Sequence, residues 1–265
     1  MKTDQLHTIK AFVIDMDGVL FRGQTRLPGA QTFLQTLQHD SVAYVLLTNN
    51  SSLTVTQYVD KLDRMGIEVP PAHIMTSAVA TAQYLAGQAK PGTPVYMIGM
   101  EGLEEALQAQ GFVLTDESPE YVVVGFDTNV TYRQLSAAAL AVRAGAVFIG
   151  TNPDLTLPTE RGLEPGAGSI LAAIEAATDV APKIIGKPQP GAFKAALSKL
   201  GTRPDETAML GDRLQTDIVG GAKAGLRTIL VLTGATSRDD LAGAEIEPDM
   251  VFDNLEQVVA AWTGD

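Results

Sequence analysis

The sequence predicts an α/β protein in which a doubly wound parallel sheet carries an inserted, smaller α/β domain. Three features of the 265 residues support this fold class: short apolar runs recur, amphipathic helical patterns separate them, and two loop-like segments bound the middle of the chain. Continuous rather than alternating apolarity is typical of strands buried on both faces of a parallel sheet. Strands that alternate with helices along the chain predict a doubly wound arrangement.

The apolar runs are the candidate strands, and a polar or glycine-bearing turn follows each of them. They are Ala11–Ile14, Val42–Leu47, Val95–Ile98, Tyr121–Val124, Ala146–Ile149, Ile184–Ile185, Thr207–Leu210 and Thr228–Leu232.

The segments between these runs contain helical patterns. Apolar side chains recur at i, i+3, i+4 and i+7 from Val55 to Leu62, and again from Phe193 to Leu200. This spacing places them on one face of a helix. Gly66 and Gly201 follow where a helix commonly ends in a left-handed residue.

Two segments rich in turn-forming residues suggest where the inserted domain begins and ends. They are Gly87–Pro94, with the sequence GQAKPGTP, and the region around Thr178–Lys183. We therefore expect a catalytic core of residues 1–80 and 181–265, and an inserted domain of residues 81–180 that contacts the substrate.

Composition excludes several classes of protein. The 45% of apolar residues is enough to form a sizeable core. The 31 acidic and 19 basic residues give a net charge of −12, which argues against nucleic acid or an anionic membrane as partner. The absence of cysteine excludes disulfides, zinc–thiolate sites and thiol nucleophiles. With no signal-peptide pattern and no apolar run of about 18 residues, we expect a cytoplasmic protein.

Polar residues that could take part in catalysis or ligand binding follow four of the candidate strands. In open α/β sheets ligands bind beyond the carboxyl ends of the strands, where such residues meet. The four segments are Asp15-Met16-Asp17-Gly18, Thr48-Asn49-Asn50-Ser51, Gly186-Lys187-Pro188, and Gly211-Asp212 with Asp217 five residues later.

Carboxylates that converge at one sheet edge need a cation among them. Two such charges 4 Å apart repel by about 4 kcal/mol at an effective dielectric constant of 20. A hard divalent ion bound by oxygen atoms, Mg²⁺, is the simplest solution. Asp212 would complete its ligands, and Asp217 would support them directly or through water.

These residue types suit phosphoryl transfer. The carboxylate of Asp15 is a weak nucleophile unless the charge of its target is neutralised, and Mg²⁺ and Lys187 would do that. Asp17 would protonate the leaving oxygen and later deprotonate a water molecule. The Thr48 hydroxyl and nearby backbone N–H groups would hold the phosphate oxygens.

The segments DMDGVL, LLTNNSS, IIGKPQP and MLGDRLQTDI resemble the four ordered motifs of the haloacid dehalogenase (HAD) superfamily of aspartyl-phosphate hydrolases. The stretches TSAVATAQYL, VGFDTNVTY, TNPDLTLPTE and GLEPGAGSILAAIEAAT are similar to the class IIA branch, the 4-nitrophenylphosphatase and sugar-phosphate phosphatase group, whose α/β cap is inserted between the second and third motifs. The resemblance covers nearly the whole chain.

The resemblance implies a role for each matching residue. Asp15 is the nucleophile and Asp17 the general acid and base; Mg²⁺ is held by Asp15, the Asp17 carbonyl and Asp212. Thr48, Asn49 and Lys187 contact the phosphate. An aspartate two residues after the nucleophile is typical of phosphatases and mutases rather than of dehalogenases. A small phosphorylated metabolite is the implied substrate, and the branch also includes homodimers formed through the cap.

Alternatives remain at the level of the sequence. A phosphomutase of the same superfamily would use the same nucleophile, and a receiver-like signalling module would be phosphorylated on an aspartate without being an enzyme. Asp127, Asn152 and Asp154 follow strands of the inserted domain and are candidates either for substrate contact or for turns. Thr48 and Asn49 are also compatible with a helix cap, and Asp217 with the first turn of a helix.

Overall fold

The computed structural model describes residues 6–159 and 161–264. The chain divides into two compact units. The first contains the described residues up to Thr48, Thr56–Met75, and those from Phe193 onward; the second contains Asn49–Val55 and Thr76–Ala192. The bounds of the inserted domain predicted from the sequence, residues 81–180, remain a prediction.

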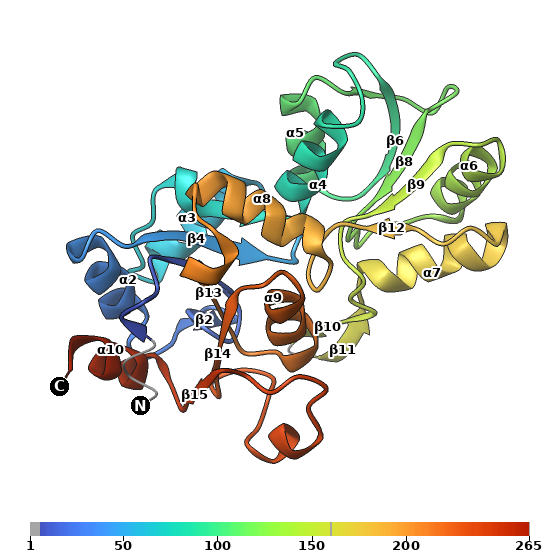
Figure 1. Cartoon of the computed structure of the whole chain (residues 1–265). Coiled ribbons are helices and arrows are strands. Elements are labelled where there is room, and N and C mark those ends of the chain that lie inside the picture. The colour runs from blue at the N-terminus through green and yellow to red at the C-terminus, as the bar shows by residue number, and fades with distance from the viewer. Residues whose placement is uncertain (1–5, 160, 265) are drawn as a thin grey trace. The chain divides into compact units, whose positions relative to one another are not determined.

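A six-stranded sheet with the order β15-β14-β13-β1-β4-β5 forms the centre of the first unit (Figure 1). β1 pairs in parallel with β13 and with β4, and β14 pairs in parallel with β13 and β15. The strands are β1 (Ala11–Ile14), β4 (Ala43–Thr48), β5 (Ile74–Thr76), β13 (Thr207–Gly211), β14 (Arg227–Val231) and β15 (Met250–Phe252).

Helices cover both faces of this sheet. They are α2 (Ala30–His39), α3 (Val55–Arg64), α8 (Pro190–Leu200), α9 (Val219–Lys223) and α10 (Leu255–Thr263). On one face Phe12 of β1 meets Phe33 of α2 and Trp262 of α10, with ring centroids 5.5 and 5.6 Å apart. On the other face, Gly221 of α9 approaches Met209 of β13. Met209 pairs with Val13, the residue that follows Phe12 in β1. Successive residues of a strand point to opposite faces, so α9 lies across the sheet from α2 and α10.

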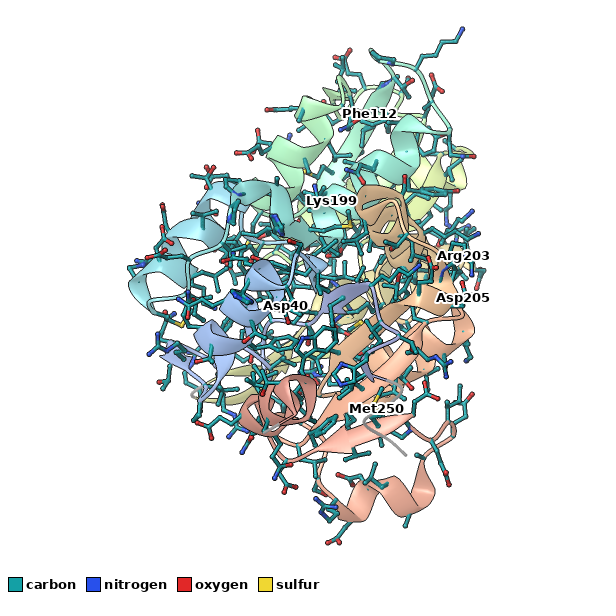
Figure 2. All side chains as sticks on the ribbon, turned by 60° about the vertical axis from the view of Figure 1, so that its left-hand side comes forward. Asp40, Phe112, Lys199, Arg203, Asp205 and Met250 are labelled. Carbon is teal, nitrogen blue, oxygen red and sulfur yellow. The ribbon has the colours of Figure 1, made fainter. Side chains whose placement is uncertain are left out.

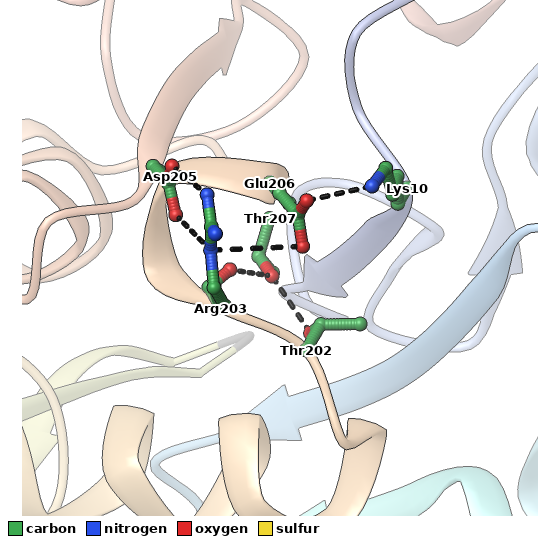
Figure 3. Close-up of polar contacts among 6 residues, drawn as sticks. All are labelled: Lys10, Thr202, Arg203, Asp205, Glu206 and Thr207. Atoms are coloured by element: carbon green, nitrogen blue, oxygen red, sulfur yellow. Dashed lines mark hydrogen bonds and ion pairs between the residues drawn. The ribbon is translucent and has the colours of Figure 1, made fainter.

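Polar contacts reinforce the edges of the first unit. The Trp262 indole donates a 2.7 Å hydrogen bond to Asp40, which Figure 2 labels at the end of α2. Figure 3 shows the network at the amino end of β1 and β13, where Lys10 pairs with Glu206 at 2.6 Å and Arg203 pairs with Asp205 at 2.6 Å. Exposed pairs of this kind add little to stability, and they lie at the strand ends opposite the predicted site.

The second unit has its own parallel sheet, with the order β12-β9-β8-β6-β7. Figure 1 shows α6 and α7 on one side of this sheet and α4 and α5 on the other. Val122, Val124 and Phe148 from the strands form a buried cluster with Ile170 and Ile174 of α7. The elements are α4 (Ser77–Ala86), β6 (Pro94–Ile98), α5 (Glu101–Ala109), β7 (Val113–Leu114), β8 (Tyr121–Val124), α6 (Tyr132–Arg143), β9 (Val147–Gly150), α7 (Ala167–Thr178) and β12 (Lys183–Ile184).

Two short antiparallel hairpins complete the fold. The hairpin of β2 (Phe21–Arg22) and β3 (Thr25–Arg26) follows β1, and the hairpin of β10 (Thr156–Thr159) and β11 (Gly162–Pro165) belongs to the second unit.

The predicted fold class is confirmed, and the candidate strands agree with the observed ones to within one residue at either end. The predicted helices are α3 and α8, and Gly66 and Gly201 follow them with φ of 68° and 66°. Among the described residues, every helix is too short or insufficiently apolar to cross a membrane.

Candidate active site

The carboxyl ends of three neighbouring strands place predicted site residues at one edge of the first sheet. Asp15 follows β1 directly, Thr48 ends β4, and Asp212 follows β13. Ile14, at the end of β1, pairs with Leu210 of β13 on one side and with Leu46 of β4 on the other. Because the strands are parallel and in this register, their last residues lie at the same level of the sheet.

Two carboxylates from these strand ends form a buried cluster with a third, that of Asp217. Asp15, Asp212 and Asp217 each offer an oxygen atom, and these oxygen atoms lie within 4.8 Å of one another. The residues are 7%, 2% and 0% exposed. Charged side chains are almost never buried so completely unless a partner compensates them, and these three have like charges when they are ionised.

A π-helical turn brings Asp217 into the cluster. The turn, η3, spans Leu214–Ile218, and Asp212 and Arg213 separate it from β13. The amide of Ile218 donates to the carbonyl of Arg213 at 3.2 Å. The amide of Arg213 in turn donates to Oδ2 of Asp217 at 3.1 Å. Turns of this type occur often at functional sites, because they redirect a side chain out of the regular helical series.

The surroundings of Asp212 fit a bound cation. Its Oδ2 accepts a 2.6 Å hydrogen bond from the amide of Ala235, whereas its Oδ1 is buried with no hydrogen-bond partner among the described residues. Burial raises the pKa of Asp212 to about 8, and the charges of Asp15 and Asp217 add to that rise. A set of carboxylate oxygens with one buried oxygen left over is the donor chemistry that Mg²⁺ takes.

Asp17 differs from these three aspartates, since its side chain reaches solvent. Desolvation by the surrounding protein raises the pKa of its carboxyl, and the charges of Lys61, Arg213 and Arg22 oppose the rise. A raised pKa suits a general acid, which must carry a proton before the reaction. Lys61 lies on α3 with its ammonium 4.1 Å from the centre of the Phe21 ring.

Thr48 is connected to the same helix. It is 7% exposed and shares a side-chain hydrogen bond with Tyr58 of α3. Burial raises the pKa of Tyr58 well above its usual value, and the charges of Asp17 and Asp15 reinforce this effect. The Tyr58 hydroxyl therefore keeps its proton and can fix the orientation of Thr48.

In the second unit, Asn49 holds the backbone of Lys187. The amide of Lys187 donates to Oδ1 of Asn49 at 2.8 Å, and Nδ2 of Asn49 donates to the carbonyl of Lys187 at 2.9 Å. Lys187 is only 2% exposed. The carbonyl of Asn49 accepts hydrogen bonds from Ser77 and Asn152, at 2.6 and 2.7 Å. The side-chain amide of Asn49 thus positions Lys187.

The predicted substrate contacts in the second unit fall into two groups. Asn152 is 4% exposed, and Asp154 accepts a 3.2 Å hydrogen bond from Asn49, so both belong to the network around Lys187. Asp127 instead accepts a 2.7 Å hydrogen bond from the amide of Asn129, which is the pattern of a turn.

The structure thus assembles two sets of predicted residues, each within one unit. The first contains Asp15, Asp212 and Asp217, and the second contains Asn49, Lys187, Asn152 and Asp154. Sequence reasoning missed Tyr58 and Lys61. Tyr58 fitted the apolar pattern of the predicted helix, and the available signal was a lysine three residues later, at the same side of that helix.

Comparison with known proteins assigns the class. Residues 12–113 match the family model of haloacid dehalogenase-like hydrolases, and residues 184–258 match a HAD-hydrolase-like model. An acid sugar phosphatase of Staphylococcus aureus (strain USA300) is 42% identical over 252 residues, which cover 95% of this chain and 97% of that protein.

Solved structures of related phosphatases are similar to this chain over nearly its whole length. The crystal structure of 4-nitrophenylphosphatase from Thermotoga maritima superimposes with a TM-score of 0.93 at 40% identity, covering 97% of this chain and 99% of that one. Glycerol phosphate phosphatase from Mycobacterium tuberculosis, solved in complex with magnesium, gives a TM-score of 0.89 at 35% identity, over 96% of this chain and 77% of that one.

The chain therefore belongs to the haloacid dehalogenase-like hydrolases. Within that family it is a phosphatase, and the resemblance seen in its motifs is confirmed.

Proposed function

We propose that this protein is a Mg²⁺-dependent phosphomonoesterase that hydrolyses small organic phosphates through a phosphoryl group carried on Asp15. The observation that carries the proposal is the buried cluster of Asp15, Asp212 and Asp217, in which one oxygen of Asp212 lacks a hydrogen-bond partner among the described residues. Three buried carboxylates without a cation would repel one another by several kcal/mol.

Asp15, the backbone carbonyl of Asp17 and Asp212 are the proposed ligands of the ion. Asp217 supports them, directly or through water, and its hydrogen bond with the amide of Arg213 keeps it in place. When bound, Mg²⁺ would offset the negative charge of the aspartates and of the phosphate oxygens.

In the proposed first step, an oxygen of Asp15 forms a bond to phosphorus while the bond from phosphorus to the leaving oxygen breaks. Asp17 gives its proton to that oxygen, so that the product leaves as a neutral alcohol. The raised pKa of Asp17 supports this role, since it increases the fraction that holds a proton at neutral pH.

In the proposed second step, a water molecule attacks the phosphorus of the aspartyl-phosphate. Asp17, now ionised, takes a proton from that water, and the bond between phosphorus and Asp15 breaks. Inorganic phosphate leaves, and both aspartates return to their starting protonation states. The backbone contacts of Lys187 with Asn49 support its assignment to phosphate binding, because they fix the base of a long, flexible side chain.

The names of the relatives suggest the substrate class. They act on sugar phosphates, 4-nitrophenyl phosphate or glycerol phosphate according to those names, and each is a phosphate monoester of a small organic group. We propose the same class for this chain, with the inserted domain selecting the leaving group and Asn152 and Asp154 as candidates for that selection.

The proposal extends to assembly and location. Tyr132 and Leu140, two turns apart on α6, are 86% and 68% exposed, which supports a homodimer formed through the second unit. The molar mass measured by light scattering tests for this homodimer, and we expect Tyr132→Glu to yield monomers. A cytoplasmic location is proposed from the cysteine-free composition.

The test of the proposed function is hydrolysis of 4-nitrophenyl phosphate and of a panel of sugar phosphates by the purified chain. We expect phosphate release that requires Mg²⁺ and is abolished by EDTA. Transfer of the phosphoryl group between two positions of a sugar, without release of phosphate, would instead identify a phosphomutase.

A further inference from the structure

A loop that follows β14 contacts Asp212 from a neighbouring strand. The loop comprises Thr233–Thr236, and we call it the 233–236 loop. The amide of Ala235 donates to Oδ2 of Asp212 at 2.6 Å, and the amide of Thr236 donates to the Asp212 backbone carbonyl at 3.2 Å. The loop thus engages both the side chain and the backbone of one aspartate.

Two glycines enclose the carboxylate of Asp212. A Cβ atom placed on Gly234 would overlap with Oδ2 of Asp212, and a Cβ placed on Gly18 would lie 2.6 Å from its Cγ. Gly18 also has a φ of 85°, a left-handed conformation that favours glycine. Any side chain at either position would push the carboxylate out of place.

The loop is also tied to the segment that carries Asp15 and Asp17. The Thr233 hydroxyl donates to the carbonyl of Gly18 at 2.6 Å. The guanidinium of Arg22, in β2, donates to the carbonyl of Thr233 and, at 3.5 Å, to that of Gly234. These contacts join two strand ends around the same carboxylate.

We propose that the 233–236 loop is a positioning element that determines which oxygen of Asp212 faces the metal ion. The loop occupies Oδ2 with the Ala235 amide, and Gly234 leaves room for the carboxylate in this orientation because it has no Cβ, so that Oδ1 is left as the metal ligand. The inference rests on the proposed function, because it assumes that Asp212 binds the ion.

Groups that hold a metal ligand in place typically change metal affinity by about 10–100-fold when they are replaced. We therefore expect Gly234→Ala to raise the dissociation constant of Mg²⁺ within roughly that range. Thr233→Val keeps the shape of the side chain but loses the hydroxyl, and should weaken Mg²⁺ binding by about fivefold, as expected for one hydrogen bond. Thr233→Ser restores the hydroxyl and should restore the affinity.

The experiment is calorimetric titration of the metal-free protein with Mg²⁺ alone, in the whole chain. Gly243→Ala is the matched control, since a Cβ at Gly243 meets no atom within 4 Å. Thermal unfolding in EDTA shows whether each variant is folded. If Gly234→Ala does not fold, the comparison of Thr233→Val with Thr233→Ser decides.

Weakened Mg²⁺ binding in Thr233→Val, with recovery in Thr233→Ser and an unchanged unfolding midpoint in EDTA, would support the inference. Equal affinities in the unmodified protein, Thr233→Val and Gly234→Ala would overturn it while leaving the proposed function intact. Absence of Mg²⁺ binding by the unmodified protein would overturn both the proposed metal site and this inference.

Discussion

Replacing Asp212 by asparagine removes one of the three ionisable groups of the carboxylate cluster while it keeps the size of the side chain. The variant can still accept the hydrogen bond from the amide of Ala235. The substitution therefore isolates the electrostatic cost of the carboxylate cluster from the packing around it.

The size of the effect follows from the pKa of Asp212, which burial and the charges of Asp15 and Asp217 raise from 3.8 to about 8. Below pH 3.8 the group is protonated in both the folded and the unfolded chain, and stability is unaffected. As the pH rises, the unfolded chain releases the proton while the folded chain retains it, so the free energy of unfolding falls by about 1.4 kcal/mol per pH unit. The loss at pH 7 is about 4 kcal/mol, and it levels off above the folded-state pKa.

Coulomb's law gives the same order of magnitude. A pair of charges about 5 Å apart repels by about 3 kcal/mol at an effective dielectric constant of 20, and Asp212 has two such neighbours. In EDTA at pH 7 we therefore expect Asp212→Asn to be more stable than the unmodified protein. A gain of about 4 kcal/mol corresponds to a rise in the unfolding midpoint on the order of 10 °C.

The assay is thermal unfolding at pH 5, 7 and 8, in EDTA and in excess Mg²⁺. The unmodified protein should lose stability with rising pH in EDTA and regain it in Mg²⁺, whereas Asp212→Asn should respond to neither. Asp63→Asn, which removes an exposed carboxylate on α3, is the control for overall charge. An Asp212→Asn variant less stable than the unmodified protein in EDTA at pH 8 would refute the view that the cluster is held together against repulsion.

Further substitutions test individual assignments. Lys187→Met should reduce kcat/KM for 4-nitrophenyl phosphate by several orders of magnitude if the buried ammonium faces the phosphoryl group. The control is Lys183→Met, at an exposed lysine four residues earlier, which should change kcat/KM by no more than a few-fold. Similar kcat/KM values for the two variants would reject the role of Lys187. Tyr58→Phe removes the hydrogen bond with Thr48 and should lower the free energy of unfolding, measured by denaturation, by about 1 kcal/mol. It should also raise KM, measured by steady-state kinetics. Asp127→Asn should leave kcat/KM nearly unchanged, because the carboxylate of Asp127 is used within its own turn; a large rise in KM would place it in contact with substrate.

Continuous apolar runs made most of the fold predictable. β1 and β8 coincide with their predicted ranges because each is a continuous apolar run bounded by polar residues or glycine. β5 (Ile74–Thr76) and β15 (Met250–Phe252) escaped prediction because three residues are too few to establish a period. The β10–β11 hairpin escaped because its strands carry proline and polar residues rather than an apolar run.

Site residues were predictable where their position in the sequence determines their position in the fold. Asp15 and Asp212 follow strands that turned out to be neighbours, and the strand-end rule is sufficient to bring them together. The use of the Asn49 side chain to hold Lys187 was not predictable, since it depends on backbone atoms more than a hundred residues away along the chain. The same holds for the 233–236 loop, whose contacts with Asp212 are made largely by backbone amides that carry no signature in the side chains.

Asp15 is the proposed acceptor of the phosphoryl group. The most direct test of this role is the mass spectrum of protein quenched in acid during turnover of 4-nitrophenyl phosphate with Mg²⁺. We expect one added phosphoryl group, mapped to Asp15, and neither the group nor turnover in Asp15→Asn. A phosphoryl group on another residue, or an Asp15→Asn variant that still turns over substrate, would contradict it.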